Sequence, residues 1–271
     1  MFGQHTLDAE LGSTFKKQGW VVLDNLFCEE ALNALDRTSL QFWEQGDIRL
    51  KKESPGWGQR PANELPEGVQ ASGLFREDKR VILRRLFGSS VDNLKKGLEP
   101  QYTYSFPTIG AQGLGLHIDG DVGGGVVTVM EGLIGVLLHD VSDADQGAFH
   151  LIPESHRKNL EFLRKHRRMP LVEAFRAIDQ LYPDTSQVTT FTGRRGQAIV
   201  CHPLLNHGAG ANLGTSVRRM AFVRVNARML NESNNPTPKK DSFTALELLR
   251  QDSYYRSRAN APFRIALGCL R

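Results

Sequence analysis

Cysteine is scarce in this chain of 271 residues, with three copies at widely separated positions, Cys28, Cys201 and Cys269. An odd number at such spacings, with no Cys-x-x-Cys pair, argues against a disulfide framework and against a cysteine zinc site. The beginning of the chain also lacks the apolar core of a secretory signal. We therefore expect a cytoplasmic protein.

Long hydrophobic runs and a strong excess of one charge are missing too. No apolar segment reaches the length of about 20 residues that spans a bilayer, so we expect no membrane association. The 34 basic and 30 acidic residues nearly balance and leave a formal net charge of +4. This small excess fits an anionic small-molecule partner as well as nucleic acid.

The pattern of the chain changes near residue 99. Before it, a β-rich run at 20–23 is followed by apolar residues at helical spacing after Glu29, and 78–97 holds enough apolar positions for one or two helices. Residues 51–73 contain proline and glycine without a period and are expected to form a surface loop. The helices should therefore lie mainly in the first third.

After this point, short apolar runs alternate with glycine-containing segments, the pattern of an antiparallel sandwich or barrel. The runs are "YTYSF", "VVTVMEGLIGVLL", "GAFHLI", "QVTTF", "GQAIVCH" and "RRMAFVRVNA". We predict a single domain over 1–271, with a strand and helices in 1–99, a β core in 100–228 and a tail in 229–271.

His117 and Asp119 lie in the glycine-rich segment "GLHIDGDVGGG". Side chains two apart in a strand point to the same side, so a His-x-Asp pair can offer a nitrogen and an oxygen to one metal ion. A third ligand can come from His202 or His207 in "CHPLLNHGAGAN", after the strand expected at 197–202. Two histidines and a carboxylate leave half of an octahedral Fe(II) open, which suits oxygen activation. A chance His-x-Asp pair is the alternative in a chain with eight histidines.

Four segments resemble, in order, the phytanoyl-CoA dioxygenase family of Fe(II)- and 2-oxoglutarate-dependent oxygenases over about residues 14–228. They are "FKKQGWVVLDNLFCEEALNAL", "LHIDGD", "GAFHLIPESH" and "GQAIVCHPLLNHGAGANLGTSVRR". The last is the most specific, because a His-Gly pair, an asparagine five residues after that histidine and an arginine eleven after it coincide. The resemblance implies a mainly β fold with flanking α-helices, a cupin-like double-stranded β-helix or jelly roll.

The resemblance also implies roles for individual residues. His117, Asp119 and His207 would bind Fe(II), and Arg218 would hold the distal carboxylate of 2-oxoglutarate. A guanidinium suits this role because its planar fork of donors matches a carboxylate. The family histidine that corresponds to His202 is not the ligand.

Other candidates for the cosubstrate pocket have structural alternatives. Tyr102 and Tyr104, on the strand before the His-x-Asp motif, are candidates for a hydrogen bond to 2-oxoglutarate, although aromatic residues in strands usually belong to the core. Asn212 either lines the cosubstrate pocket or is a left-handed turn residue. Arg219 should face away from Arg218, into solvent.

The activity implied is that of a dioxygenase that uses Fe(II), 2-oxoglutarate and O2 to hydroxylate an unactivated carbon, with release of succinate and CO2. Desaturation, epoxidation and ring closure are alternatives within this chemistry, whereas halogenation is not expected because Asp119 fills the position that is small in related halogenases. A non-oxygenase isomerase or a ligand-binding protein of cupin type are further alternatives. The substrate should be a small metabolite, and the basic segment 157–168 is either a lid over an anionic substrate or a solvated helix face. We expect no nucleic-acid partner, because this segment lacks interleaved aromatic residues.

Overall fold

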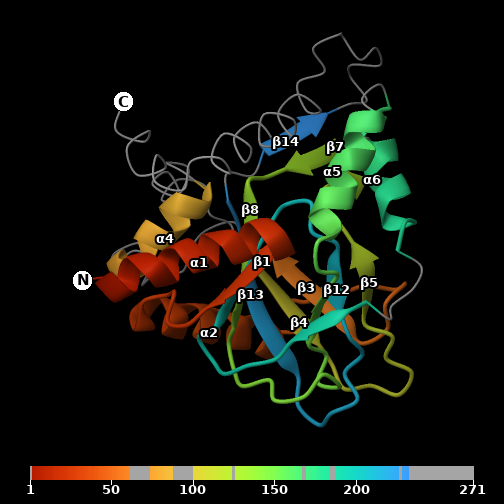
Figure 1. Cartoon of the computed structure of the whole chain (residues 1–271). Helices are drawn as coiled ribbons and strands as arrows, with labels where there is room; N and C mark the ends of the chain where they lie inside the picture. Colours follow the sequence, from red (N-terminus) through yellow and green to blue (C-terminus); the bar gives the residue numbers. More distant parts are fainter. Residues whose placement is uncertain are drawn as a thin grey trace.

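The computed structural model describes residues 2–61, 74–87, 100–123, 126–166, 169–182, 187–225 and 228–231. Within these ranges, helices cover the outer face of a large antiparallel sheet, and smaller sheets lie beyond it (Figure 1). This mainly β architecture with flanking helices is the predicted jelly roll. No described helix is both long and apolar enough to cross a bilayer.

The helices are α1 (Phe2–Gln18), α2 (Glu29–Glu44), α4 (Glu77–Phe87), α5 (Ser155–Lys165) and α6 (Leu171–Asp179). The first strands are β1 (Trp20–Leu23), β2 (Arg49–Leu50), β3 (Trp57–Pro61), β4 (Gln101–Ser105), β5 (Leu114–His117), β6 (Asp121–Gly123) and β7 (Val126–Val129). The later strands are β8 (Gly132–Leu137), β9 (Phe149–Leu151), β10 (Thr189–Phe191), β11 (Ala198–Cys201), β12 (His207–Ala209), β13 (Arg218–Val225) and β14 (Arg228–Asn231).

The described strands form three sheets. The largest has the order β1-β11-β8-β13-β4-β3-β2, the second has the order β10-β9-β12-β5, and the third has the order β14-β7-β6. Every pairing between these strands is antiparallel, and many neighbours are far apart in the sequence, such as β1 and β11. β11, late in the β core, therefore lies beside β1, near the beginning of the chain.

Alternation along β13 divides the interior into two apolar clusters. Ala221 and Val223 point to the cluster shared with the N-terminal helices, whereas Met220 and Phe222 belong to a second cluster that includes residues of β9 and β10. Because side chains two apart in a strand share a face, the even-numbered side of β13 faces the smaller sheet. Arg218, the first residue of β13, lies on this side.

The structure corrects part of the prediction for the first third. The strand at 20–23 and the helix after Glu29 are confirmed as β1 and α2. The surface loop expected over 51–73 is wrong for Trp57–Pro61, which forms β3 and pairs with β4. Pairing and the burial of Trp57 there outweigh the missing hydrophobic period. α1 was not predicted.

The ends of two predicted segments lie outside the described residues. α4 corresponds to the first part of the helical region at 78–97, of which 88–97 is not described. β14 pairs with β7, so strand structure continues past the expected core boundary at 228. Most of the tail expected over 229–271 falls in 232–271, beyond the described chain.

Candidate active site

A cavity lies between the two largest sheets. Its apolar wall is made by Trp57, Leu114, Leu133, Phe149 and Phe222, and its polar and charged lining includes Gln101, Thr103, His117, Asp119, His207, Arg218 and Arg224. Trp57, Gln101, Thr103 and Arg224 were not singled out from the sequence. The cavity therefore joins a polar centre to a hydrophobic surface, as small-molecule sites do.

Strand pairing brings His117, Asp119 and His207 together at this cavity. His117 ends β5 and lies opposite His207, the first residue of β12, with ring centroids 4.8 Å apart. Asp119 follows two residues after His117, and its Oδ1 lies 3.6 Å from Nε2 of His117 and 3.9 Å from Nε2 of His207. One ligand atom from each residue fits within 4.8 Å of the others, so the three could hold a metal ion.

Hydrogen bonds fix which nitrogen of each imidazole faces this centre. Nδ1 of His117 lies 2.8 Å from the carbonyl oxygen of Gly115, and Nδ1 of His207 lies 2.9 Å from that of Leu205. A carbonyl can only accept, so each Nδ1 carries the proton and donates it. Each Nε2 is left with a lone pair directed toward Asp119, as a metal-binding histidine requires.

Burial and neighbouring charges shift the pKa values of these three residues in different directions. Burial and the neighbouring His117 lower the pKa of His207 to about 4, so its ring is neutral near pH 7. Burial would also lower the pKa of His117, but the neighbouring Asp119 carboxylate favours the protonated ring and raises this pKa above its usual value. Burial would raise the pKa of Asp119, yet Arg224 and the two histidines hold it well below its usual range. The centre therefore offers an ionised carboxylate.

Arg224 binds one oxygen of the Asp119 carboxylate and leaves the other facing the two histidines. Its Nε and Nη2 lie 3.1 and 2.9 Å from Oδ2 of Asp119, whereas Oδ1 is the oxygen nearest both histidines. One carboxylate oxygen is thus held by the guanidinium, and the other faces the site. Alternation could have identified Arg224, because it lies six residues after Arg218 on the same face of β13.

Arg218 is a fully buried cation, 1% exposed, at another part of the same cavity. Its Nε donates to the carbonyl oxygen of Gly147 and its Nη1 donates to Oγ1 of Thr103, each at 2.8 Å. Burial lowers its pKa to about 10, and no described carboxylate is among the causes. The side chain stays charged near pH 7 and has donors to spare, a combination suited to an anionic ligand.

The structure corrects the expectation for Tyr102 and Tyr104. Both rings lie in the cluster shared with the N-terminal helices, and the Tyr104 hydroxyl donates to the carbonyl oxygen of Ser39 on α2 at 2.8 Å. Because β4 alternates, Gln101 and Thr103 face the cavity instead. Neither tyrosine lines the described cavity.

Asn212 organises a loop and does not line the cavity. Its amide nitrogen donates to the carbonyl oxygens of Ser105 and Ser216, and its Oδ1 accepts from the Gly214 backbone at 3.0 Å. Its φ is not positive, so the left-handed alternative is wrong as well. The residue connects the loop before β13 to the end of β4.

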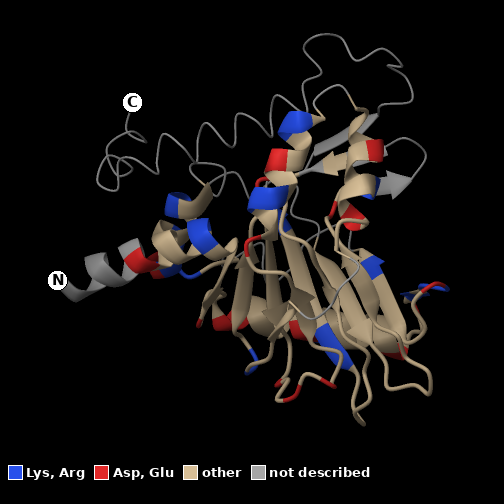
Figure 2. Ribbon diagram, turned by 45° about the vertical axis from the view of Figure 1, so that its right-hand side comes forward, with Lys and Arg blue, Asp and Glu red and all other residues tan. Residues whose placement is uncertain are grey.

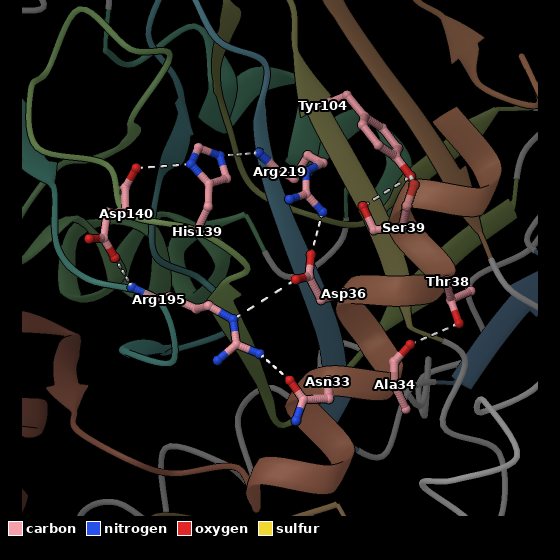
Figure 3. Close-up of polar contacts among 10 residues, drawn as sticks. All are labelled: Asn33, Ala34, Asp36, Thr38, Ser39, Tyr104, His139, Asp140, Arg195 and Arg219. Atoms are coloured by element: carbon pink, nitrogen blue, oxygen red, sulfur yellow. Dashed lines mark hydrogen bonds and ion pairs between the residues drawn. The ribbon is translucent and has the colours of Figure 1, made fainter. Parts of the chain in front are cut away.

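Arg219 faces away from the cavity as predicted, but it is not solvated. It forms an ion pair with Asp36 of α2, whose other oxygen lies 3.9 Å from Nε of Arg195 (Figure 3). Its backbone N–H donates to Nε2 of His139 at 2.9 Å. Arg219 therefore ties β13 to the helix layer.

His202, the rival to His207, lies outside the cluster. Its Nδ1 accepts from the Leu204 backbone at 3.0 Å, and its ring is 4.9 Å from that of His156. Burial lowers its pKa well below the usual value. It belongs to the buried contact between α1 and α5.

Three basic residues of α5, Arg157, Lys158 and Lys165, are exposed, and Arg164 is half-buried. Arg157 and Lys165 pair with Glu154 and Glu161 within the helix region, and none of the four lines the cavity. Figure 2 shows the same distribution over the molecule, with charged residues mainly on helices and loops and few on the strands. For the described part of the basic segment, 157–166, this arrangement favours the solvated helix face over the anion-binding lid; residues 167–168 lie outside the described chain.

Comparisons with known proteins identify the family of the chain. The family model for phytanoyl-CoA dioxygenase matches residues 15–220. A comparison with curated proteins gives no match. Among solved structures, the non-heme alpha-ketoglutarate-dependent carbocyclase SnoK from nogalamycin biosynthesis is 17% identical with a TM-score of 0.50, covering 79% of this chain and 82% of its own.

Two further structures are similar at comparable levels. HygX from Streptomyces hygroscopicus, solved with nickel, 2-oxoglutarate and hygromycin B, is 16% identical over 79% of this chain and 85% of its own, with a TM-score of 0.46. EctD from S. alaskensis is 17% identical over 83% and 78%, with a TM-score of 0.46. The family match covers most of the chain, and the protein belongs to the phytanoyl-CoA dioxygenase family of Fe(II)- and 2-oxoglutarate-dependent oxygenases.

Proposed function

We propose that His117, Asp119 and His207 bind Fe(II), that Arg218 anchors 2-oxoglutarate, and that the enzyme hydroxylates an unactivated carbon of a small-molecule substrate. The observation that carries this proposal is the convergence of two Nε2 lone pairs and one carboxylate oxygen on a single point of the cavity. Two histidines and one carboxylate are the ligand set of oxygen-activating Fe(II).

The donor set fits the metal in chemistry as well as in position. Bound Fe(II) would supply the oxidation of 2-oxoglutarate by O2 to succinate and CO2, with the second oxygen atom available for the substrate. The chain's own part is to keep Oδ1 of Asp119 turned toward the metal while Arg224 occupies Oδ2. The carbonyl oxygens of Gly115 and Leu205 keep both imidazoles in the tautomer that can bind.

Arg218 is placed to orient the cosubstrate. The bonds from Arg218 to Gly147 and Thr103 use two of its five N–H groups, which leaves a fork for the distal carboxylate. Burial makes such a pair strong because little water competes for the charges. The apolar wall of Trp57 and Phe149 would exclude water from the reacting atoms.

An anionic group on the substrate is a further part of the proposal. Arg218 and Arg224 outnumber the single carboxylate of Asp119 in the cavity lining. If Arg218 is used by 2-oxoglutarate, Arg224 can still offer N–H groups beyond those on Asp119. A screen of paired acidic and neutral metabolites would test this point, with faster turnover expected for the acidic member.

The direct test is succinate formation from 2-oxoglutarate under air with added Fe(II), while a set of candidate metabolites is screened. We expect succinate release that rises with the right substrate and disappears in Asp119→Ala and His207→Ala, with the fold intact by circular dichroism. His202→Ala is the matched control and should stay active if it folds. An isomerase or a ligand-binding protein would bind metal or ligand without forming succinate.

Mass spectrometry of the product separates oxygen insertion from desaturation and ring closure. Hydroxylation and epoxidation each add one oxygen atom that should carry the label from 18O2, and exchange of one proton of the product for deuterium in D2O distinguishes the new hydroxyl from an epoxide. Loss of two hydrogens without added oxygen would instead indicate desaturation or ring closure.

A further inference from the structure

The proposed metal ligands come from two segments far apart in the chain, and one helical hairpin contacts both segments. This hairpin, defined as α5, α6 and the residues that follow as far as Tyr182, lies between β9 and β10 in the sequence. α5 and α6 lie side by side near β5 and β7 (Figure 1). The basic outer side of α5 has no part in the site, so the inner side of the hairpin is the relevant one.

The α6 helix holds the first segment by its backbone and by packing. Oδ1 of Asp179, the last residue of α6, accepts from the backbone N–H of Ile118 at 2.9 Å. Ile118 stands between the two ligands of the His-x-Asp motif, and its buried side chain joins the apolar cluster of the hairpin. Phe175 lies so close to Gly120 that a Cβ there would overlap its ring. The α6 helix thus contacts the His-x-Asp motif on the side away from the cavity.

The α5 helix holds the second segment in the same manner. Nδ2 of Asn159 donates to the carbonyl oxygen of Leu204 at 2.8 Å, and Oγ of Ser155 accepts from the backbone N–H of Asn206 at 2.8 Å. Leu205, which lies between Leu204 and Asn206, supplies the carbonyl oxygen that accepts from Nδ1 of His207 and so fixes its ring. Leu204 also packs in the apolar cluster that contains Ile118, the residue between His117 and Asp119.

A hydroxyl adds a polar link between the two helices, beside the apolar cluster that both share. The Tyr182 hydroxyl lies 2.7 Å from Oδ1 of Asn159 and 3.3 Å from the carbonyl oxygen of Ser155. Burial raises the pKa of Tyr182 to about 12, so the hydroxyl keeps the proton that it donates. With Nδ2 occupied by the loop before His207 and Oδ1 by this hydroxyl, the Asn159 side chain has a partner on each side.

We propose that the α5–α6 hairpin sets the distance between the two halves of the metal site, with Asp179 and Tyr182 as positioning residues that touch neither metal nor substrate. The inference rests on the proposed function, because it concerns the same three ligands. His117 and Asp119 belong to one strand end and His207 to another, and β12 and β5 are paired with a register irregularity between His207 and Ala209. The hairpin adds a second, independent link between these strand ends.

The first test compares two tyrosine hydroxyls. Tyr182→Phe removes the oxygen that joins α6 to α5, whereas Tyr104→Phe removes a buried hydroxyl that also bonds to a helix carbonyl but lies on the far side of the large sheet. Co(II) is titrated into each full-length variant and followed by visible absorption. We expect Tyr182→Phe to bind Co(II) about fivefold to tenfold more weakly, near the lower limit for outer partners of metal ligands. Tyr104→Phe should bind as the unaltered chain does.

The second test separates hydrogen bonding from charge at Asp179. Asp179→Ala removes the acceptor for the Ile118 backbone, and we expect about tenfold weaker Co(II) binding. Asp179→Asn keeps an oxygen acceptor and loses only the charge, so it should restore most of the affinity. Asp143→Ala is the matched control, since its carboxylate accepts from the backbone of Asp145 in an exposed loop and should not affect binding.

The outcomes distinguish the hairpin from the site that it serves. If Tyr182→Phe and Tyr104→Phe bind Co(II) equally well, or if Asp179→Asn is as weak as Asp179→Ala, the positioning role is wrong while the metal site stands. If the unaltered chain and His207→Ala bind Co(II) equally, the proposed function fails, and the hairpin proposal fails with it.

Discussion

Replacing Arg218 by methionine should weaken 2-oxoglutarate binding strongly while changing the stability of the ligand-free protein little. Arg218 is 1% exposed, and burial lowers its pKa from 12.5 to about 10. At about 1.4 kcal/mol per pKa unit, holding this charge costs the folded state about 3 kcal/mol at pH 7. Arg218→Met removes that cost but leaves the Gly147 carbonyl and the Thr103 hydroxyl without a donor, at about 1 kcal/mol or more each.

The two effects on folding therefore nearly cancel, and we expect the free energy of unfolding to change by no more than about 1 kcal/mol. The effect on the cosubstrate does not cancel, because breaking a buried, hydrogen-bonded charge pair costs about 2–5 kcal/mol. A loss of about 3 kcal/mol corresponds to a Kd for 2-oxoglutarate raised about 150-fold. Urea unfolding and anaerobic calorimetry with 2-oxoglutarate measure the two quantities. An affinity within threefold of the unaltered chain would refute the assignment of Arg218.

Three further perturbations have defined outcomes. Thr103→Val should raise the KM for 2-oxoglutarate several-fold in the succinate assay, because a partner of the Arg218 guanidinium is lost; an unchanged KM would contradict this. His156 has a pKa lowered to about 4 by burial, so the unfolded chain takes up the proton first, and this residue alone should contribute a loss of about 3 kcal/mol of stability between pH 6.5 and pH 4 in the ligand-free protein. In His156→Gln, the free energy of unfolding measured with urea should fall less steeply as the pH is lowered across this range. Gly120→Ala should cost about 1–3 kcal/mol by overlap with Phe175, and adding Phe175→Leu should recover part of it in thermal melts.

The sequence predicted those parts of the site that follow from strand geometry and spacing. A His-x-Asp pair at a strand end places both side chains on one side, and the structure brings His207 opposite His117. The register between β5 and β12, which selects His207 over His202, is a long-range pairing that no local pattern encodes. The resemblance to the family supplied that choice.

The errors have the same physical origin. Tyr102 and Tyr104 lie on the correct strand but on its other face, and only the burial of neighbouring residues tells one face from the other. Trp57 belongs to a strand because β4 is available to pair with it, although its own neighbours are glycine and proline-rich. The ion pair of Arg219 with Asp36 likewise depends on how α2 covers the sheet.

Two predictions about the whole chain stay predictions, namely the single domain over 1–271 and the cytoplasmic location. The hairpin contacts made by Asp179 and Tyr182 had no signal in the sequence, because they join residues that are 61 and 23 positions apart. Side chains that hold other residues in place become recognisable only when the fold is known.

Anaerobic absorption spectroscopy shows whether His117, Asp119 and His207 meet at one ferrous ion that 2-oxoglutarate can then bind. Fe(II) and 2-oxoglutarate are added together, and the visible charge-transfer band of the ternary complex is recorded. We expect the band in the unaltered chain and in His202→Ala, and its loss in His207→Ala. A band that persists in His207→Ala and disappears in His202→Ala would contradict this expectation.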